Sequence, residues 1–225
     1  MSPNALPVAD IVQVLDNGPG RWDLPSGWVW SSLAEVAAIN PPTDLSGLSG
    51  DAEIPLVPMA AVAEETGVID TSRRRPVAAV RKGYVRFCEG DVIFAKITPC
   101  MENGKVAPVH GIEGGYAAGS TEFHVLRPSC IDTRYLWYWL VRRAFRAEAA
   151  HNMSGTAGQL RVPIDYLRSA LVPLPPLAEQ RRIVARIDEL FAEIDEGEAA
   201  LERARQGLDT WRRGLLKAAV TGELV

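Results

Sequence analysis

The pattern of hydrophobic and polar residues predicts short strands in the first half of the chain. Over residues 54–126, runs rich in β-branched and aromatic residues alternate with Gly, Pro or Asn, which is typical of strands. The strands predicted are 54–58, 83–87, 91–96, 105–109 and 122–126, with short helices at 33–38 and near 57–65. Together they predict an α+β class, a mixed α/β domain with a curved, largely antiparallel sheet.

A helix is predicted over 132–150, with Asp132 or Thr133 as its N-cap. Its apolar stripe consists of Leu136, Trp139, Leu140 and Ala144. Three arginines lie off this stripe and are expected to form a solvated face: Arg142, Arg143 and Arg146. A Gly-containing loop follows at 152–158, and residues 160–172 are expected to form a strand, a turn and a second strand.

The pattern changes at Leu177, after the stiff Pro-rich segment 173–176. Apolar or small residues now alternate at spacings of four and three for nearly five heptads, which predicts a coiled-coil helix over 177–217, about 60 Å long. Gly197 and Ala204 are the two small residues in this row. The others are expected to pair with a second helix, most simply one from another copy: Ile183, Ile187, Leu190, Ile194, Leu201, Leu208, Trp211 and Leu215.

The composition of the chain predicts a globular, cytoplasmic protein. The 225 residues are 47% hydrophobic and 23% charged, which excludes wholesale disorder. No apolar run reaches the length of a transmembrane helix, and the N-terminus lacks the basic start of a secretory signal. Three cysteines at unhelpful spacings fit a reducing compartment better than a disulfide framework.

Charge is distributed unevenly along the chain. Residues 1–70 carry one basic and ten acidic side chains, residues 71–168 carry fifteen and eight, and residues 169–225 carry eight and ten. A basic middle segment suggests contact with nucleic acid, because Lys and Arg neutralise phosphates while Asn and Gln can read base edges. The candidate DNA-binding residues are Arg73, Arg74, Arg75, Lys82, Lys96, Thr98, Asn103, Lys105, Thr156, Gln159 and Arg161.

No catalytic centre emerges from the motifs. The tetrapeptide 40–43 has Thr43 where an adenine methyltransferase needs an aromatic residue, and no Gly-rich cofactor turn precedes it. Asn103-Gly104-Lys105 lacks the remainder of a phosphate loop. The histidines and cysteines are not at metal-binding spacings. We therefore expect a protein that is not an enzyme and needs no cofactor or metal.

Several segments together resemble one family. These are GDVIFAKITPC at 90–100 with NGK at 103–105, GT at 155–156 with Gln159, Arg161 and Val162, and PLPPLAEQRRIV at 173–184. LPSGW at 24–28 and TGEL at 221–224 also fit. The chain resembles a type I restriction-modification DNA specificity subunit over residues 24–225, in a half-length form with one target recognition domain.

The resemblance implies a division into a leader (1–23), a recognition domain (24–172), a boundary (173–176), a conserved helix (177–217) and a tail (218–225). It implies double-stranded DNA, methyltransferase subunits and an endonuclease subunit as partners. The usual member has two recognition domains and two long helices, whereas this sequence has one of each. A two-fold antiparallel homodimer would supply the second recognition domain and the second helix, and it would read a bipartite, palindromic target.

Three alternatives stay open. The first is a coiled-coil interaction module whose basic domain binds another protein. The second is a stand-alone enzyme, which the missing glycine-rich motif disfavours. The third is a half-subunit that exchanges with a different specificity chain.

Overall fold

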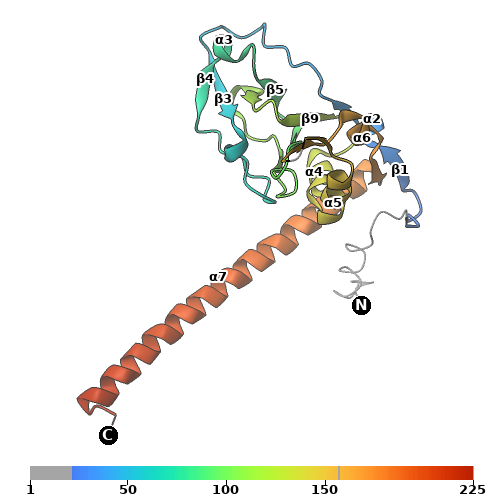
Figure 1. Cartoon of the computed structure of the whole chain (residues 1–225). Coiled ribbons are helices and arrows are strands. Elements are labelled where there is room, and N and C mark those ends of the chain that lie inside the picture. The colour runs from blue at the N-terminus through green and yellow to red at the C-terminus, as the bar shows by residue number, and fades with distance from the viewer. Residues whose placement is uncertain (1–21, 157, 225) are drawn as a thin grey trace. The chain divides into compact units, whose positions relative to one another are not determined.

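The computed structural model describes residues 22–156 and 158–224, which divide into two units after Arg181. All the strands assigned to the described residues belong to the first unit, and the second is helical up to Thr221 (Figure 1). Residues 1–21 of the leader predicted over 1–23 lie outside the described residues. None of the described helices combines the length and the apolar character needed to cross a bilayer.

Two four-stranded sheets build the body of the first unit, where the sequence predicted one. The first sheet, with order β2-β9-β6-β7, is antiparallel throughout and consists of β2 (Ala37–Ile39), β9 (Phe123–Pro128), β6 (Val92–Ala95) and β7 (Val106–Pro108). The second, with order β4-β3-β8-β5, consists of β4 (Arg74–Pro76), β3 (Glu53–Val57), β8 (Tyr116–Gly119) and β5 (Val85–Cys88). Only its β3–β8 pair is parallel. The predicted class, mixed and largely antiparallel, is confirmed.

One apolar cluster joins the two sheets. Phe87 of β5, Ile93 of β6 and Phe123 of β9 are all buried within it. Gly119 allows the close approach of β8 to this cluster, because a Cβ atom there would lie 2.7 Å from the carbonyl oxygen of Val57. The cluster therefore fixes the strand ends that carry the polar loops.

Short helices and a small sheet complete the first unit. Helix α2 (Leu33–Val36) starts with a capping box in which the backbone N–H of Ser32 donates to Glu35. It ends earlier than predicted, because β2 takes up residues 37–39. Strand β1 (Val29–Ser32) pairs with β12 (Leu171–Leu174), so part of the Pro-rich boundary is a strand. The remaining short elements are η1 (Met59–Ala61), α3 (Val77–Val80) and η2 (Glu113–Gly115).

The helix predicted over 132–150 is two helices, α4 (Thr133–Val141) and α5 (Arg143–His151). Asp132 is the N-cap, as predicted, and its side chain accepts from two backbone N–H groups. The break lies at Arg142, whose ψ of 139° is extended. Its guanidinium stacks 3.4 Å from the ring centroid of Trp139, a cation–π contact that stabilises this conformation.

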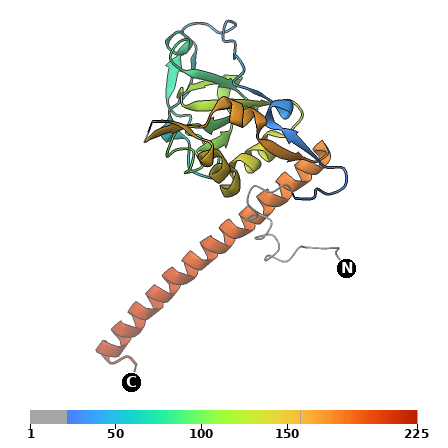
Figure 2. The same ribbon diagram turned by 45° about the vertical axis from the view of Figure 1, so that its right-hand side comes forward.

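Residues 160–172 differ from the predicted strand, turn and strand. The hairpin of β10 (Ser154–Thr156) and β11 (Gln159–Arg161) comes first and extends away from the two sheets (Figure 2). Helix α6 (Ile164–Ser169) then precedes β12. It forms because Leu167 is fully buried and α6 packs against α2.

The long helix predicted over 177–217 is confirmed. Helix α7 runs without interruption from Leu177 to Thr221, four residues beyond the predicted end. Its heptad row is described below with the other candidate surfaces.

Candidate nucleic-acid interface

The loop between β6 and β7 contains four of the predicted DNA-binding residues, and its second half is tied to the protein interior. Lys105 Nζ donates to the carbonyl oxygens of Val62 at 2.8 Å and Met59 at 3.4 Å. Asn103 Nδ2 donates to a carboxylate oxygen of Glu64 at 3.0 Å. Both side chains therefore hold the loop against residues 59–64, which disfavours the phosphate and base contacts predicted for them.

Arg146 also ties this half of the loop to the rest of the unit. The prediction of a solvated face is wrong for Arg146, which is buried and donates to the carbonyl oxygen of Glu102 and to the carboxylate of Glu65. Gly104 lies beside this pair with a φ of +75°, and a Cβ atom there would lie 2.8 Å from Cγ of Glu65. A charged side chain from α5 thus holds the loop from within.

The first half of the same loop joins the β10–β11 hairpin. The N–H of Val162 donates to the carbonyl oxygen of Lys96 at 2.8 Å, and the N–H of Thr98 donates to that of Leu160 at 3.0 Å. The hydroxyl of Thr98 donates to a carboxylate oxygen of Glu102 at 3.0 Å. The structure therefore brings together Lys96, Thr98 and the hairpin, which lie about sixty positions apart in the sequence.

An ion pair anchors the base of the hairpin. Arg161 Nε and Nη2 each donate to one carboxylate oxygen of Glu122, both at 2.9 Å. The Arg161 guanidinium holds the pKa of the Glu122 carboxyl below its usual value. Beyond this anchor, Thr156 and Gln159 are exposed and their side chains are available to a ligand. Glu122 was missed in the sequence; its only signal is an acidic residue at the start of a strand in a basic segment.

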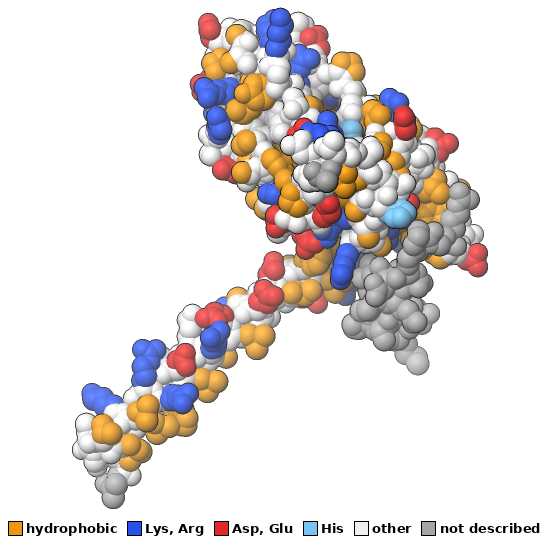
Figure 3. All heavy atoms as spheres, in the orientation of Figure 1, with side chains coloured by type: hydrophobic (Ala, Val, Ile, Leu, Met, Phe, Trp, Pro, Cys, Tyr) orange, Lys and Arg blue, Asp and Glu red, His pale blue; other side chains and the backbone are white. Residues whose placement is uncertain are grey.

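The remaining predicted cations lie around β4 and α3. Arg73, Arg75 and Lys82 are exposed, whereas Arg74 Nη1 pairs with Glu113 at 2.8 Å and its Nη2 donates to a backbone carbonyl. Figure 3 shows the blue side chains gathered at the end of the unit that holds β4 and α3. Three of these four side chains are thus available to an anionic partner.

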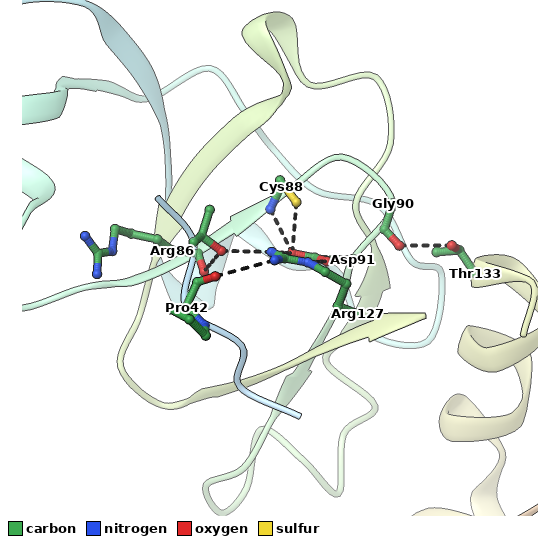
Figure 4. Close-up of polar contacts among 8 residues, drawn as sticks. Pro42, Arg86, Cys88, Gly90, Asp91, Arg127 and Thr133 are labelled. Atoms are coloured by element: carbon green, nitrogen blue, oxygen red, sulfur yellow. Dashed lines mark hydrogen bonds and ion pairs between the residues drawn. The ribbon is translucent and has the colours of Figure 1, made fainter. Parts of the chain in front are cut away.

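A buried carboxylate ties the turn between β5 and β6 to β9. Asp91 is 1% exposed, and Arg127 of β9 donates to both of its oxygens, at 2.8 and 2.9 Å (Figure 4). Asp91 also accepts from the N–H of Cys88, and Arg127 donates to the Thr43 hydroxyl at 2.9 Å. Residues 40–43 are therefore an irregular segment that hydrogen bonds hold against β9 and its neighbours. They have no catalytic arrangement around them in the described part of the chain.

The described residues contain no group of three or more His, Cys, Asp or Glu side chains placed to hold a metal ion. His124 is buried in a purely structural arrangement. Its Nδ1 lies 3.0 Å from Asn40 Nδ2 and its Nε2 lies 2.9 Å from the carbonyl oxygen of Val162. The ring is therefore neutral, with Nε2 as donor and Nδ1 as acceptor, and burial lowers the pKa of His124.

The second candidate surface is the heptad row of α7. Orange side chains follow one side of the helix in Figure 3. Ile183, Ile187 and Leu215 are partly exposed. The other five predicted pairing residues are exposed: Leu190, Ile194, Leu201, Leu208 and Trp211. Large apolar side chains at these positions bury their surface only when another element covers them.

Comparison with known proteins identifies the family of the chain. The family described as type I restriction modification DNA specificity domain matches residues 25–203. The EcoAI and EcoEI specificity subunits of type I restriction enzymes from Escherichia coli are 37% and 35% identical over 177 residues, 78% of this chain and 30% of each relative. The chain thus spans about a third of the length of these relatives.

Solved structures show the same fold. The HsdS subunit from Thermoanaerobacter tengcongensis is 26% identical, with a TM-score of 0.66 over 83% of this chain and 48% of that one. A structure reported for complex assembly and conformational transition of the type I R-M system is 25% identical, with a TM-score of 0.58 over 87% of this chain and 45% of that one.

Proposed function

The chain belongs to the type I restriction modification DNA specificity family, and from this premise we propose that it recognises double-stranded DNA as the specificity subunit of such a system. It performs no chemistry itself. It selects the site at which partner subunits act on DNA, in the cytoplasm. The observation that carries this proposal is a family match over most of the chain, combined with a polar hairpin anchored beside Lys96.

The hairpin supplies groups suited to DNA. A two-stranded β-ribbon fits the major groove of B-DNA, and a glutamine can pair with both hydrogen-bonding positions of adenine. Gln159 and Thr156 lie on the exposed strands of the hairpin, and Lys96 lies at its base. We assign base contacts to the first two and a phosphate contact to Lys96.

Helix α7 supplies the means of association. Its exposed apolar row follows a heptad pattern, which supports pairing with the same helix of a second copy. We infer an antiparallel pair related by a two-fold axis. Two recognition domains related by a two-fold axis read two half-sites with an unread spacer between them, so the target is bipartite and palindromic. The polar sides of the paired helices remain for methyltransferase and endonuclease subunits.

The test is binding of the full chain to duplex DNA over a series of salt concentrations. We expect log K to fall linearly with log salt, with a slope of about −0.9 for each phosphate contact. Binding to a protein partner that is insensitive to salt, with no shift of any duplex at low ionic strength, would instead favour a protein-interaction module.

A further inference from the structure

Two neighbouring hollows in the first unit share one exposed aromatic residue, Tyr84. The first, of about 250 Å³, is lined by Tyr84, Arg86, Lys96 and Asn40 among others. The second, of about 330 Å³, is lined by Tyr84, Arg73, Ser120 and Thr121 among others. We call these seven residues the Tyr84 surface. Because both hollows include Tyr84, they adjoin each other at this residue.

The chemistry of this surface is one-sided. Among the described residues that line either hollow, three are cationic, Arg73, Arg86 and Lys96, and none is acidic. Another hollow of the same unit, of about 370 Å³, has three acidic and two cationic side chains in its lining: Glu89, Asp91, Asp132, Arg127 and Arg181. The excess of positive charge is therefore specific to the Tyr84 surface, since the other hollow does not share it. A polyanion is the ligand that such a lining attracts.

Tyr84 itself is placed for contact with a ligand. The residue is 40% exposed and follows Gly83, whose φ of +80° makes the turn before β5. An exposed aromatic ring between cations and hydroxyl groups suits a nucleic-acid strand, because the ring packs against sugar or base while cations and hydroxyls contact phosphate oxygens. Ser120 and Thr121 supply those hydroxyl groups.

The surface is continuous with the hairpin. Lys96 lines the first hollow, and its backbone N–H and carbonyl bond to Glu122 and Val162 at 2.9 and 2.8 Å. Glu122 in turn holds Arg161 of the hairpin. The Tyr84 surface and the base of the hairpin therefore adjoin at Lys96, so a duplex in contact with the hairpin has the Tyr84 surface as its neighbour.

We propose that the Tyr84 surface binds the phosphodiester backbone of the DNA that the hairpin reads, with Tyr84 packed against the strand and Arg73 and Lys96 on its phosphates. This rests on the proposed function and deepens it, because it assigns a contact that sets affinity and register without reading sequence. Its effect is the same for every duplex, whereas the effect of the hairpin differs between sequences.

The test uses the full chain and two duplexes, one selected by the wild type from random DNA and one scrambled. The variants are Arg73→Ala, Tyr84→Ala and Tyr84→Phe. The control is Arg168→Ala, which removes an exposed cation of the same unit that lines neither hollow. Thermal unfolding confirms that each variant is folded. Should Tyr84→Ala fail to fold, Arg73→Ala and Tyr84→Phe carry the test.

We expect Arg73→Ala and Tyr84→Ala to weaken binding to both duplexes by the same factor, about tenfold each, as loss of a stacking or charge contact does. Arg73→Ala also lowers the magnitude of the salt slope by about 0.9. Tyr84→Phe falls between Tyr84→Ala and the wild type. Variants that bind like the wild type and Arg168→Ala, or that lose only the selected duplex, would overturn the inference. A wild type that binds neither duplex would overturn the proposed function with it.

Discussion

Arg161 and Glu122 meet through two parallel hydrogen bonds of 2.9 Å, the strongest geometry available to a guanidinium and a carboxylate. Arg161 is the last residue of the β10–β11 hairpin, and Glu122 is the last residue of the turn before β9. The pair therefore sets the direction in which the hairpin presents Thr156 and Gln159. A carboxylate on a DNA-binding face would repel phosphates, and Arg161 neutralises it.

Glu122→Gln is expected to leave Arg161 uncompensated and the hairpin loosely held. Binding to scrambled duplex then strengthens, and the preference for the selected duplex falls by about tenfold, equivalent to about 1.4 kcal/mol. Competition titrations with the two duplexes measure this ratio. The exchanged pair, Glu122→Arg with Arg161→Glu, restores part of the preference. If the single and the exchanged variants discriminate equally well, the pair does not position the hairpin.

Gln159 and Lys96 are expected to respond differently to truncation. Gln159→Ala removes the proposed base contact, so it is expected to reduce binding to the selected duplex by about 1–3 kcal/mol and to change the sequences recovered in selection. Lys96→Ala removes the proposed phosphate contact, so it is expected to weaken all duplexes alike and to lower the salt slope by about 0.9. Equal losses on every sequence from Gln159→Ala would remove that residue from base reading.

The long helix and the major strands could be predicted from the sequence because each depends on local periodicity. The heptad row continues without interruption, so α7 was located to within four residues of its end. Five of the eight strands in the two sheets, β3, β5, β6, β7 and β9, are likewise predicted through alternation and punctuating Gly or Pro, whereas β2, β4 and β8 are not. Their grouping into two sheets was not predictable, since it depends on which distant strands share the cluster around Phe87 and Ile93.

The candidate site was only partly predictable because its contacts join distant positions. The sequence predicts Arg146 on a solvated face. The side chain is instead buried, because it pairs with the carboxylate of Glu65, 81 positions away in the sequence. The sequence predicts Lys105 as a phosphate ligand. Its ammonium group instead donates to the carbonyl oxygens of Met59 and Val62, some forty positions earlier in the sequence. Nothing in the sequence marks Tyr84 as a binding residue, since a lone aromatic residue beside a glycine is common in turns.

Arg127→Ala is expected to destabilise the first unit by about 2–3 kcal/mol. It leaves the carboxylate of Asp91 buried without its cation, and the partial exposure of Arg127 moderates the loss. Urea denaturation followed by tryptophan fluorescence measures the change. The double variant Asp91→Asn with Arg127→Met is predicted to be more stable than the sum of its single variants indicates. Strict additivity would mean that the two side chains are not coupled.

His124 is expected to make the stability fall as the pH drops below about 6.5. Burial lowers its folded-state pKa, so below the unfolded value near 6.5 the unfolded chain binds the additional proton and folding weakens. Carboxylates with lowered pKa values, such as Glu122, lose their contribution only below about 4.5. Thermal unfolding at a series of pH values should show the loss in the wild type and a smaller one in His124→Gln. An equal loss in both would assign the effect elsewhere.

Helix pairing is expected to depend on the apolar row of α7. Leu201→Glu with Leu208→Glu places charges on the seam and is predicted to convert a dimer into a monomer, because like charges at facing core positions repel. Mass measurement by light scattering detects the change. Ala199→Glu, on the opposite side of the helix, serves as the control and is predicted to remain dimeric. A wild type that is monomeric at every concentration would contradict the proposed association.

The most direct test of the central claim is selection of duplexes by the full chain from a random library. The account predicts recovery of two short sequence blocks, inverted with respect to each other and separated by an unread spacer of constant length. Recovery of no preferred sequence, or of one contiguous asymmetric block, would contradict it.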